Sequence, residues 1–126
     1  MNELAVAARK DVDAASKGIL LFYAAECGLK AIYMSRNSLR MASDKNSAAK
    51  KSASEFGHKL DDLIRELKIR PDRLSHTPGS ITMNTGEPLS VNEVHQAWRY
   101  GGVISEHEAV LEWLGRAIAY VTEEFK

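Results

Sequence analysis

The chain has 126 residues and a mass of 14.0 kDa, so we expect a single domain over residues 1–126 that folds without a disulfide or a structural metal. Lys and Arg total 17, as do Asp and Glu, which excludes an overall charge that would steer the chain to nucleic acid or to an anionic membrane. The hydrophobic content of 44% and the 3 prolines exclude collagenous and largely disordered classes.

Cysteine content and hydropathy bear on the compartment. Cys27 is the only cysteine, so the sequence allows neither an intrachain disulfide nor a cysteine-based zinc site. The longest apolar stretch, residues 18–25, is too short to span a bilayer, and residues 1–3 lack the positive charge of a secretory signal. We therefore expect a cytoplasmic protein with no membrane contact and no cofactor, in which Cys27 is an inert core residue.

The first predicted helix covers residues 4–34, which contain good helix formers and no proline. Its apolar residues, from Ile19 to Tyr33, occupy more than half of the circumference, which is typical of a helix in the middle of a bundle. We expect Gly18 to divide it into a short first helix and a buried second one, because an interior glycine costs about 1 kcal/mol relative to alanine.

The composition of residues 35–54 predicts a mobile connection. Their excess of positive charge is typical of a solvated loop, although it could also meet phosphates.

The middle of the chain predicts one helix and a long loop. Apolar residues at i, i+3, i+4 and i+7 from Leu60 predict a helix over residues 56–68, which Pro71 terminates. Turn signals make residues 70–89 mostly loop, with a short strand at residues 80–83.

Two Ser-x-x-Glu capping boxes predict the last two helices. The box at residues 90–93 starts a helix near Val91 that ends at the glycine pair 101–102. The box at residues 105–108 starts the final helix, which carries two apolar stripes. One stripe is enough for an intramolecular core, so the second predicts either a partner helix or a wide core face.

Three motifs resemble the HEPN (higher eukaryotes and prokaryotes nucleotide-binding) domain family. Residues 23–32 resemble its A-x-E-x-x-L-K-A helix, residues 57–63 its H-D-L-x-x-L signature, and residues 98–101 the R-Y that precedes its final helix. The three motifs follow the family's order. The resemblance implies an all-α, up-and-down bundle of four to five helices, commonly a homodimer, in a prokaryotic toxin–antitoxin, defence or nucleotidyltransferase-partner setting.

Candidate binding residues lie within these motifs. Glu26 and Lys30 are four residues apart in the favourable acid-before-base order, so their side chains can pair. A buried pair needs further hydrogen bonds, which His58 can supply from near the start of its helix. We therefore predict a structural lock between two helices. A ligand or nucleotide pocket lined by Glu26, Lys30, His58 and Tyr100 is a further hypothesis.

Candidate catalytic residues follow from the resemblance. Many HEPN proteins are metal-independent ribonucleases that carry Arg followed, after four to six residues, by His. The imidazole transfers protons and the guanidinium stabilises the charge on the phosphate. Arg99 and His107 occupy the family position, but seven residues separate them. Arg70 and His76, with five residues between them, have the family spacing but lie in the Pro71 loop.

We expect a dimeric HEPN-like interaction module that serves as an accessory or scaffold component of a prokaryotic defence or toxin–antitoxin system and catalyses no reaction itself. The alternative is a metal-independent endoribonuclease that uses an Arg/His pair at a dimer cleft. RNA, a nucleotide or a protein encoded by a neighbouring gene are the partners that this family setting implies.

Overall fold

The computed structural model describes residues 3–47, 49–75, 78 and 80–125, with side chains from Ala14 onward. It contains helices α1 (Glu3–Arg36), α2 (Leu60–Glu66), α3 (Val94–Arg99) and α4 (His107–Glu124), and 3₁₀ turns at Ala53–Phe56 and Val91–Glu93. Two short strands, β1 (Ile81–Thr82) and β2 (Pro88–Leu89), pair antiparallel with Ile81 opposite Leu89. The all-α class is confirmed, and the strand predicted at residues 80–83 is present as β1.

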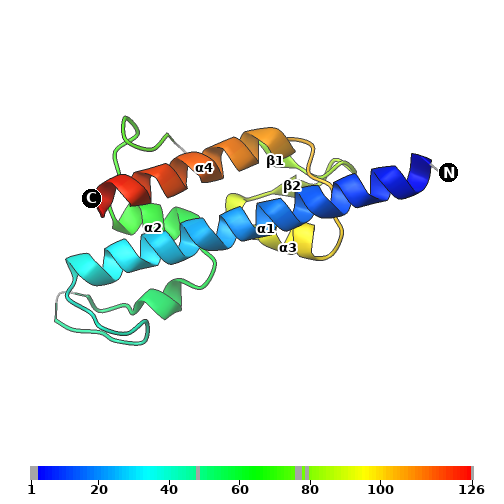
Figure 1. The fold of residues 1–126 in the computed structure, drawn as a ribbon. Coiled ribbons are helices and arrows are strands. Elements are labelled where there is room, and N and C mark those ends of the chain that lie inside the picture. Colours follow the sequence, from blue (N-terminus) through cyan, green and yellow to red (C-terminus); the bar gives the residue numbers. More distant parts are fainter. Residues whose placement is uncertain (1–2, 48, 76–77, 79, 126) are drawn as a thin grey trace.

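The two long helices α1 and α4 form the frame of the fold. They lie side by side and run in the same direction, with α2 and α3 packed against them (Figure 1). At the shared end, the guanidinium of Arg36 lies 3.6 Å from the carboxylate of Glu124. This arrangement differs from an up-and-down bundle, in which the first and fourth helices run in opposite directions. The chain between α1 and α4 returns only once along α1, because α2 and α3, with 7 and 6 residues, do not form two long antiparallel crossings; α4 therefore begins at the end opposite to the C-terminus of α1 (Figure 1).

Helix α1 continues unbroken through Gly18 for 34 residues, so the predicted division into two helices is wrong. A Cβ atom built on Gly18 would lie 2.7 Å from three ring atoms of Trp98. The glycine therefore permits α3 to approach α1 closely rather than ending the helix. Burial of the indole, which is 4% exposed, offsets the unfavourable helix propensity of glycine.

The hydrophobic core accounts for both apolar stripes of α4. Val110, Trp113 and Ala117 on one stripe and Leu111 and Leu114 on the other are buried. The remaining positions of the second stripe, Ile118 and Val121, pack against the same core. The second stripe is thus a wide core face, and α4 leaves only its C-terminal neighbour Phe125 largely exposed among the large apolar residues of this region.

The segments on either side of α2 differ from their predictions. The helix predicted over residues 56–68 is confined to Leu60–Glu66, because Gly57 and Lys68 have positive φ angles of 55° and 54° that interrupt the helical hydrogen bonds. Pro71 is therefore not what ends it. The connection after α1 contains buried residues, Ala49 and Ala53 among them. Two of its cations make contacts within the chain: Lys45 pairs with Glu55 at 3.2 Å and Lys51 lies over the ring of Phe56.

Only one of the two capping boxes forms. Glu93 accepts a hydrogen bond from the backbone N–H of Ser90, as predicted, although the first turn is 3₁₀ rather than α-helical. The box predicted at residues 105–108 is wrong. The backbone N–H of Ser105, which would have to donate to Glu108 in this box, instead donates to the carbonyl oxygen of Thr82 on β1, and α4 begins at His107. A tertiary contact thus takes this N–H away from local capping.

Candidate functional site

Glu26 of α1 is the centre of a buried polar contact between α1 and the segment before α2. Its carboxylate is 6% exposed and accepts a hydrogen bond from Nδ1 of His58 at 2.5 Å. The second carboxylate oxygen lies 3.6 Å from Nζ of Lys30. Both contacts, with His58 and with Lys30, were predicted from the sequence as a structural lock between two helices. The His58 side chain is 47% exposed, so the lock reaches the surface at its imidazole.

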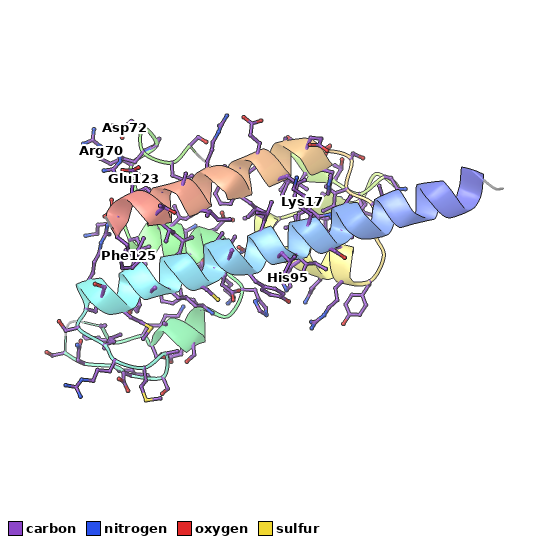
Figure 2. All side chains as sticks on the ribbon, in the orientation of Figure 1. Lys17, Arg70, Asp72, His95, Glu123 and Phe125 are labelled. Carbon is purple, nitrogen blue, oxygen red and sulfur yellow. The ribbon has the colours of Figure 1, made fainter. Side chains whose placement is uncertain are left out.

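His95 of α3 packs against His58, and the sequence analysis did not predict its place in this site. Its ring centroid is 4.4 Å from that of His58 and 4.7 Å from that of Phe22, on which it stacks. Figure 2 shows His95 beside the middle of α1. We call Glu26, His58 and His95 the histidine cluster. A signal was present: the apolar stripe of Val91, Val94 and Trp98 has His95 at the one position where periodicity requires an apolar residue.

His95 is buried without full hydrogen bonding. It is 3% exposed, and Nδ1 makes no well-formed hydrogen bond within the described residues. Burial lowers the pKa of His95 below its ordinary value of 6.5, and the nearby charges of His58 and Arg99 lower this pKa further. The backbone of Asn92 and the charge of Glu26 oppose the shift. His95 is therefore neutral at neutral pH.

We predict that His95 makes the stability depend on pH. The unfolded chain binds a proton at His95 more readily than the folded chain does, because the pKa of His95 is lower in the folded state. The free energy of unfolding should therefore be highest above pH 6.5 and should fall as the pH drops from 6.5 toward the folded-state pKa. Urea unfolding between about pH 5 and pH 8 measures this.

The variant His95→Gln should have a flatter pH profile than the wild type. Identical slopes for the wild type and His95→Gln would contradict the assignment.

The histidine cluster can orient an imidazole for proton transfer. A carboxylate that accepts from Nδ1 holds the tautomer in which Nε2 carries a lone pair, and in this fold that imidazole is the half-exposed His58. Tyr100, which was expected to line the same pocket, is 80% exposed and makes no hydrogen bond to Glu26, Lys30 or His58 in the described part of the chain. The structure thus joins Glu26, Lys30 and His58 by direct contacts that do not include Tyr100.

Arg99 and His107 lie at two hollows that adjoin along Trp98. One hollow, of about 350 Å³, is lined by Arg99, Ser16 and Ile19 together with Trp98. The other, of about 230 Å³, is lined by His107 and Ile104 together with Trp98. The His107 ring stands edge-on to the indole, with the centroids 5.6 Å apart. The two hollows thus adjoin, with Ala15, Trp98, Gly102 and Val103 in common; Arg99 lines one and His107 the other.

The second candidate pair cannot be assembled from the described residues. Arg70 is exposed and lies 3.1 Å from the carboxylate of Asp72, whereas His76 lies outside the residues that the structure describes. Figure 2 shows Arg70 and Asp72 together near the C-terminal end of α4, distant from His95. The guanidinium of Arg70 is therefore occupied by a neighbouring acid.

Cys27 differs from its prediction, because its side chain is exposed rather than part of the core. Helix α1 turns Ala25 and Glu26 inward, which leaves Cys27 on the outer face. Among the described residues, no three His, Cys, Asp or Glu side chains are grouped so that they could hold a metal ion. In the same part of the chain, no helix is both long and apolar enough to cross a membrane.

No protein-family model matches the chain, and no curated protein or solved structure is significantly similar to it. The HEPN resemblance therefore stays a prediction from the three sequence motifs.

Proposed function

We propose that the chain is a HEPN-like helical interaction module, a homodimer in the prokaryotic cytoplasm that serves as an accessory or scaffold component of a defence or toxin–antitoxin system and catalyses no reaction itself. The observation that carries this proposal is that the His107 ring packs edge-on against Trp98 while Arg99 lines the adjoining hollow, and no hydrogen bond in the described residues brings the two side chains to one group. Cleavage of RNA without a metal requires a guanidinium and an imidazole to act on the same phosphate. This arrangement favours a module without this chemistry.

The remaining polar candidates support a structural role. Glu26 is bonded to Lys30 and His58, and Arg70 is paired with Asp72. The surface also carries large exposed apolar side chains, including Leu20 at 70% and Tyr100 at 80% exposure. Side chains of this type are common at protein interfaces, Tyr most of all. An interaction module is consistent with this surface.

A metal-independent ribonuclease is the second candidate, because Glu26 orients the half-exposed imidazole of His58. A carboxylate–imidazole pair of this kind is a general base in many hydrolytic enzymes. In that case His58, rather than His107, would take the proton from a ribose hydroxyl. Arg99 would stabilise the phosphate, alone or with the Arg99 of a second copy.

We predict that the purified protein leaves single-stranded RNA and transfer RNA intact in the absence of divalent metal. Gel analysis of end-labelled RNA measures this. Specific cleavage that disappears in both Arg99→Ala and His107→Ala would overturn the proposal in favour of the family pair. Loss in His58→Gln and Glu26→Gln would assign the reaction to the histidine cluster, and loss in Arg70→Ala and His76→Ala would assign it to the Pro71 loop.

We also predict a homodimer. Light scattering of the same sample should give a mass of about twice 14.0 kDa, and a monomer at every concentration would remove the dimer from the proposal.

A further inference from the structure

The hollow between α1, Trp98 and the turn after α3 has the size and lining of a small-ligand site. Its volume of about 350 Å³ lies within the range of small-molecule pockets. Ala15 and Ile19 from α1, Trp98 from α3 and Val103 after the turn give it apolar walls. We call it the Trp98 groove.

Two glycines line this groove at the turn after α3. Gly101 has a φ angle of 81° that favours glycine. A Cβ atom on Gly102 would lie 2.7 Å from Cε of Met83 and 2.9 Å from the carbonyl oxygen of Ala97. The backbone conformation and the close packing of this turn therefore both require glycine.

Arg99 is the charged residue of the groove, and it differs from most other arginines of the fold. Five arginines with described side chains lie within 4.0 Å of a carboxylate: Arg36, Arg65, Arg70, Arg73 and Arg116. Arg99 makes no ion pair and donates no side-chain hydrogen bond within the described residues, although it lines an apolar hollow. An unpaired guanidinium next to apolar walls is complementary to a ligand that carries an anionic group.

Trp98 also has an unmet hydrogen bond, at an atom that solvent does not reach. Its indole Nε1 is buried and has no hydrogen-bond acceptor among the described residues, whereas Nε1 of the other tryptophan, Trp113, donates to the carbonyl oxygen of Ser75 at 2.9 Å. A buried donor without an acceptor is uncommon in folded proteins and calls for an explanation. The residue that carries this donor forms part of the groove wall.

We propose that the Trp98 groove binds a small aromatic molecule with an anionic group, whose apolar body lies against Ala15, Ile19 and Trp98 and whose carboxylate, sulfonate or phosphate pairs with Arg99. This inference concerns ligand binding and does not depend on whether the chain cleaves RNA. The apolar walls provide affinity for the ring system, and the single guanidinium selects for the charge.

Two dyes test the proposal: the anionic 1-anilinonaphthalene-8-sulfonate and its uncharged analogue N-phenyl-1-naphthylamine. The folded protein should bind one molecule of each dye, measured by fluorescence titration with near-UV circular dichroism unchanged. Arg99→Gln should weaken binding of the sulfonate about tenfold and leave binding of the uncharged dye unaltered. Arg40→Gln is the matched control, because the Arg40 guanidinium is also exposed and makes no ion pair within the described residues, but it lies in the loop after α1. It should change neither affinity.

A larger side chain in the groove should abolish binding of both dyes. Ala15→Leu fills the groove from α1, and Ser16→Leu at the neighbouring exposed position serves the same purpose if Ala15→Leu does not fold. Loss of binding of both dyes, with Arg99→Gln selective for the sulfonate, supports the proposal. Equal sulfonate affinity in the wild type and Arg99→Gln, binding unaffected by the leucine variants, or no saturable binding to the folded protein would each overturn it.

Discussion

Gly18→Ala should destabilise the fold by about 2 kcal/mol, although alanine is the better helix former by about 1 kcal/mol. The new methyl group would lie 2.7 Å from three ring atoms of Trp98, a distance that real Cβ atoms do not adopt. The indole is rigid and 4% exposed, so it cannot yield without moving α3 away from α1. Thermal and urea unfolding measure the loss, which corresponds to a melting temperature several degrees lower.

Gly115→Ala is the control for Gly18→Ala, and its effect should have the opposite sign. Gly115 also lies inside a helix, α4, but nothing lies within 4 Å of a Cβ atom built there. The substitution should therefore raise the free energy of unfolding by about 0.5–1 kcal/mol, the gain expected of alanine over glycine in a helix. If both variants shift stability in the same direction, the packing of Trp98 on Gly18 is not what this position requires.

Glu26→Ala should cost about 1–3 kcal/mol of folding free energy. The substitution removes the acceptor for His58 and leaves the Lys30 ammonium, whose side chain is 18% exposed, without its counter-ion. Stranding a mostly buried charge is more costly than losing a surface pair, because the ammonium keeps its desolvation penalty. Denaturant unfolding at neutral pH measures this effect.

The chain contains a matched control for the Glu26–Lys30 pair. Glu112 and Arg116 on α4 have the same i, i+4 spacing, but their side chains are 65% and 58% exposed. Glu112→Ala should change stability by no more than about 0.5 kcal/mol, since water replaces the lost contact. Equal losses for Glu26→Ala and Glu112→Ala would mean that the contact with His58 adds nothing to stability.

The histidine cluster shows how far the sequence leads toward a site. The spacing of Glu26 and Lys30 and the position of His58 were sufficient to predict their contacts. His95 was not predicted, because it is 37 residues from His58 in sequence and its neighbours Val94 and Trp98 read as core. Periodicity identifies the buried face of a helix but not the residue of another element that the face meets.

Trp98 and Thr82 illustrate the same limit. The sequence could treat Gly18 only as a weak point in a helix, since the indole that requires it comes from α3. Likewise, Ser105 and Glu108 have the spacing of a capping box, but the strand β1 brings Thr82 close enough to accept from the Ser105 backbone N–H. In both cases a contact with a distant segment overrides what the local sequence favours.

By itself the sequence determined the helical class, the approximate extents of the first and last helices, the cap at Ser90 and the pairing of Glu26 with Lys30. These features depend on periodicity and on hydrogen bonds between residues within four positions of each other, which any stretch of chain carries with it. Only the tertiary structure decided the parallel course of α1 and α4, the exposure of Cys27, and the placement of Arg99 and His107 at two adjoining hollows beside Trp98. Those features depend on the relative rotation and spacing of packed elements, which are set by the fit of side chains that are far apart in the chain.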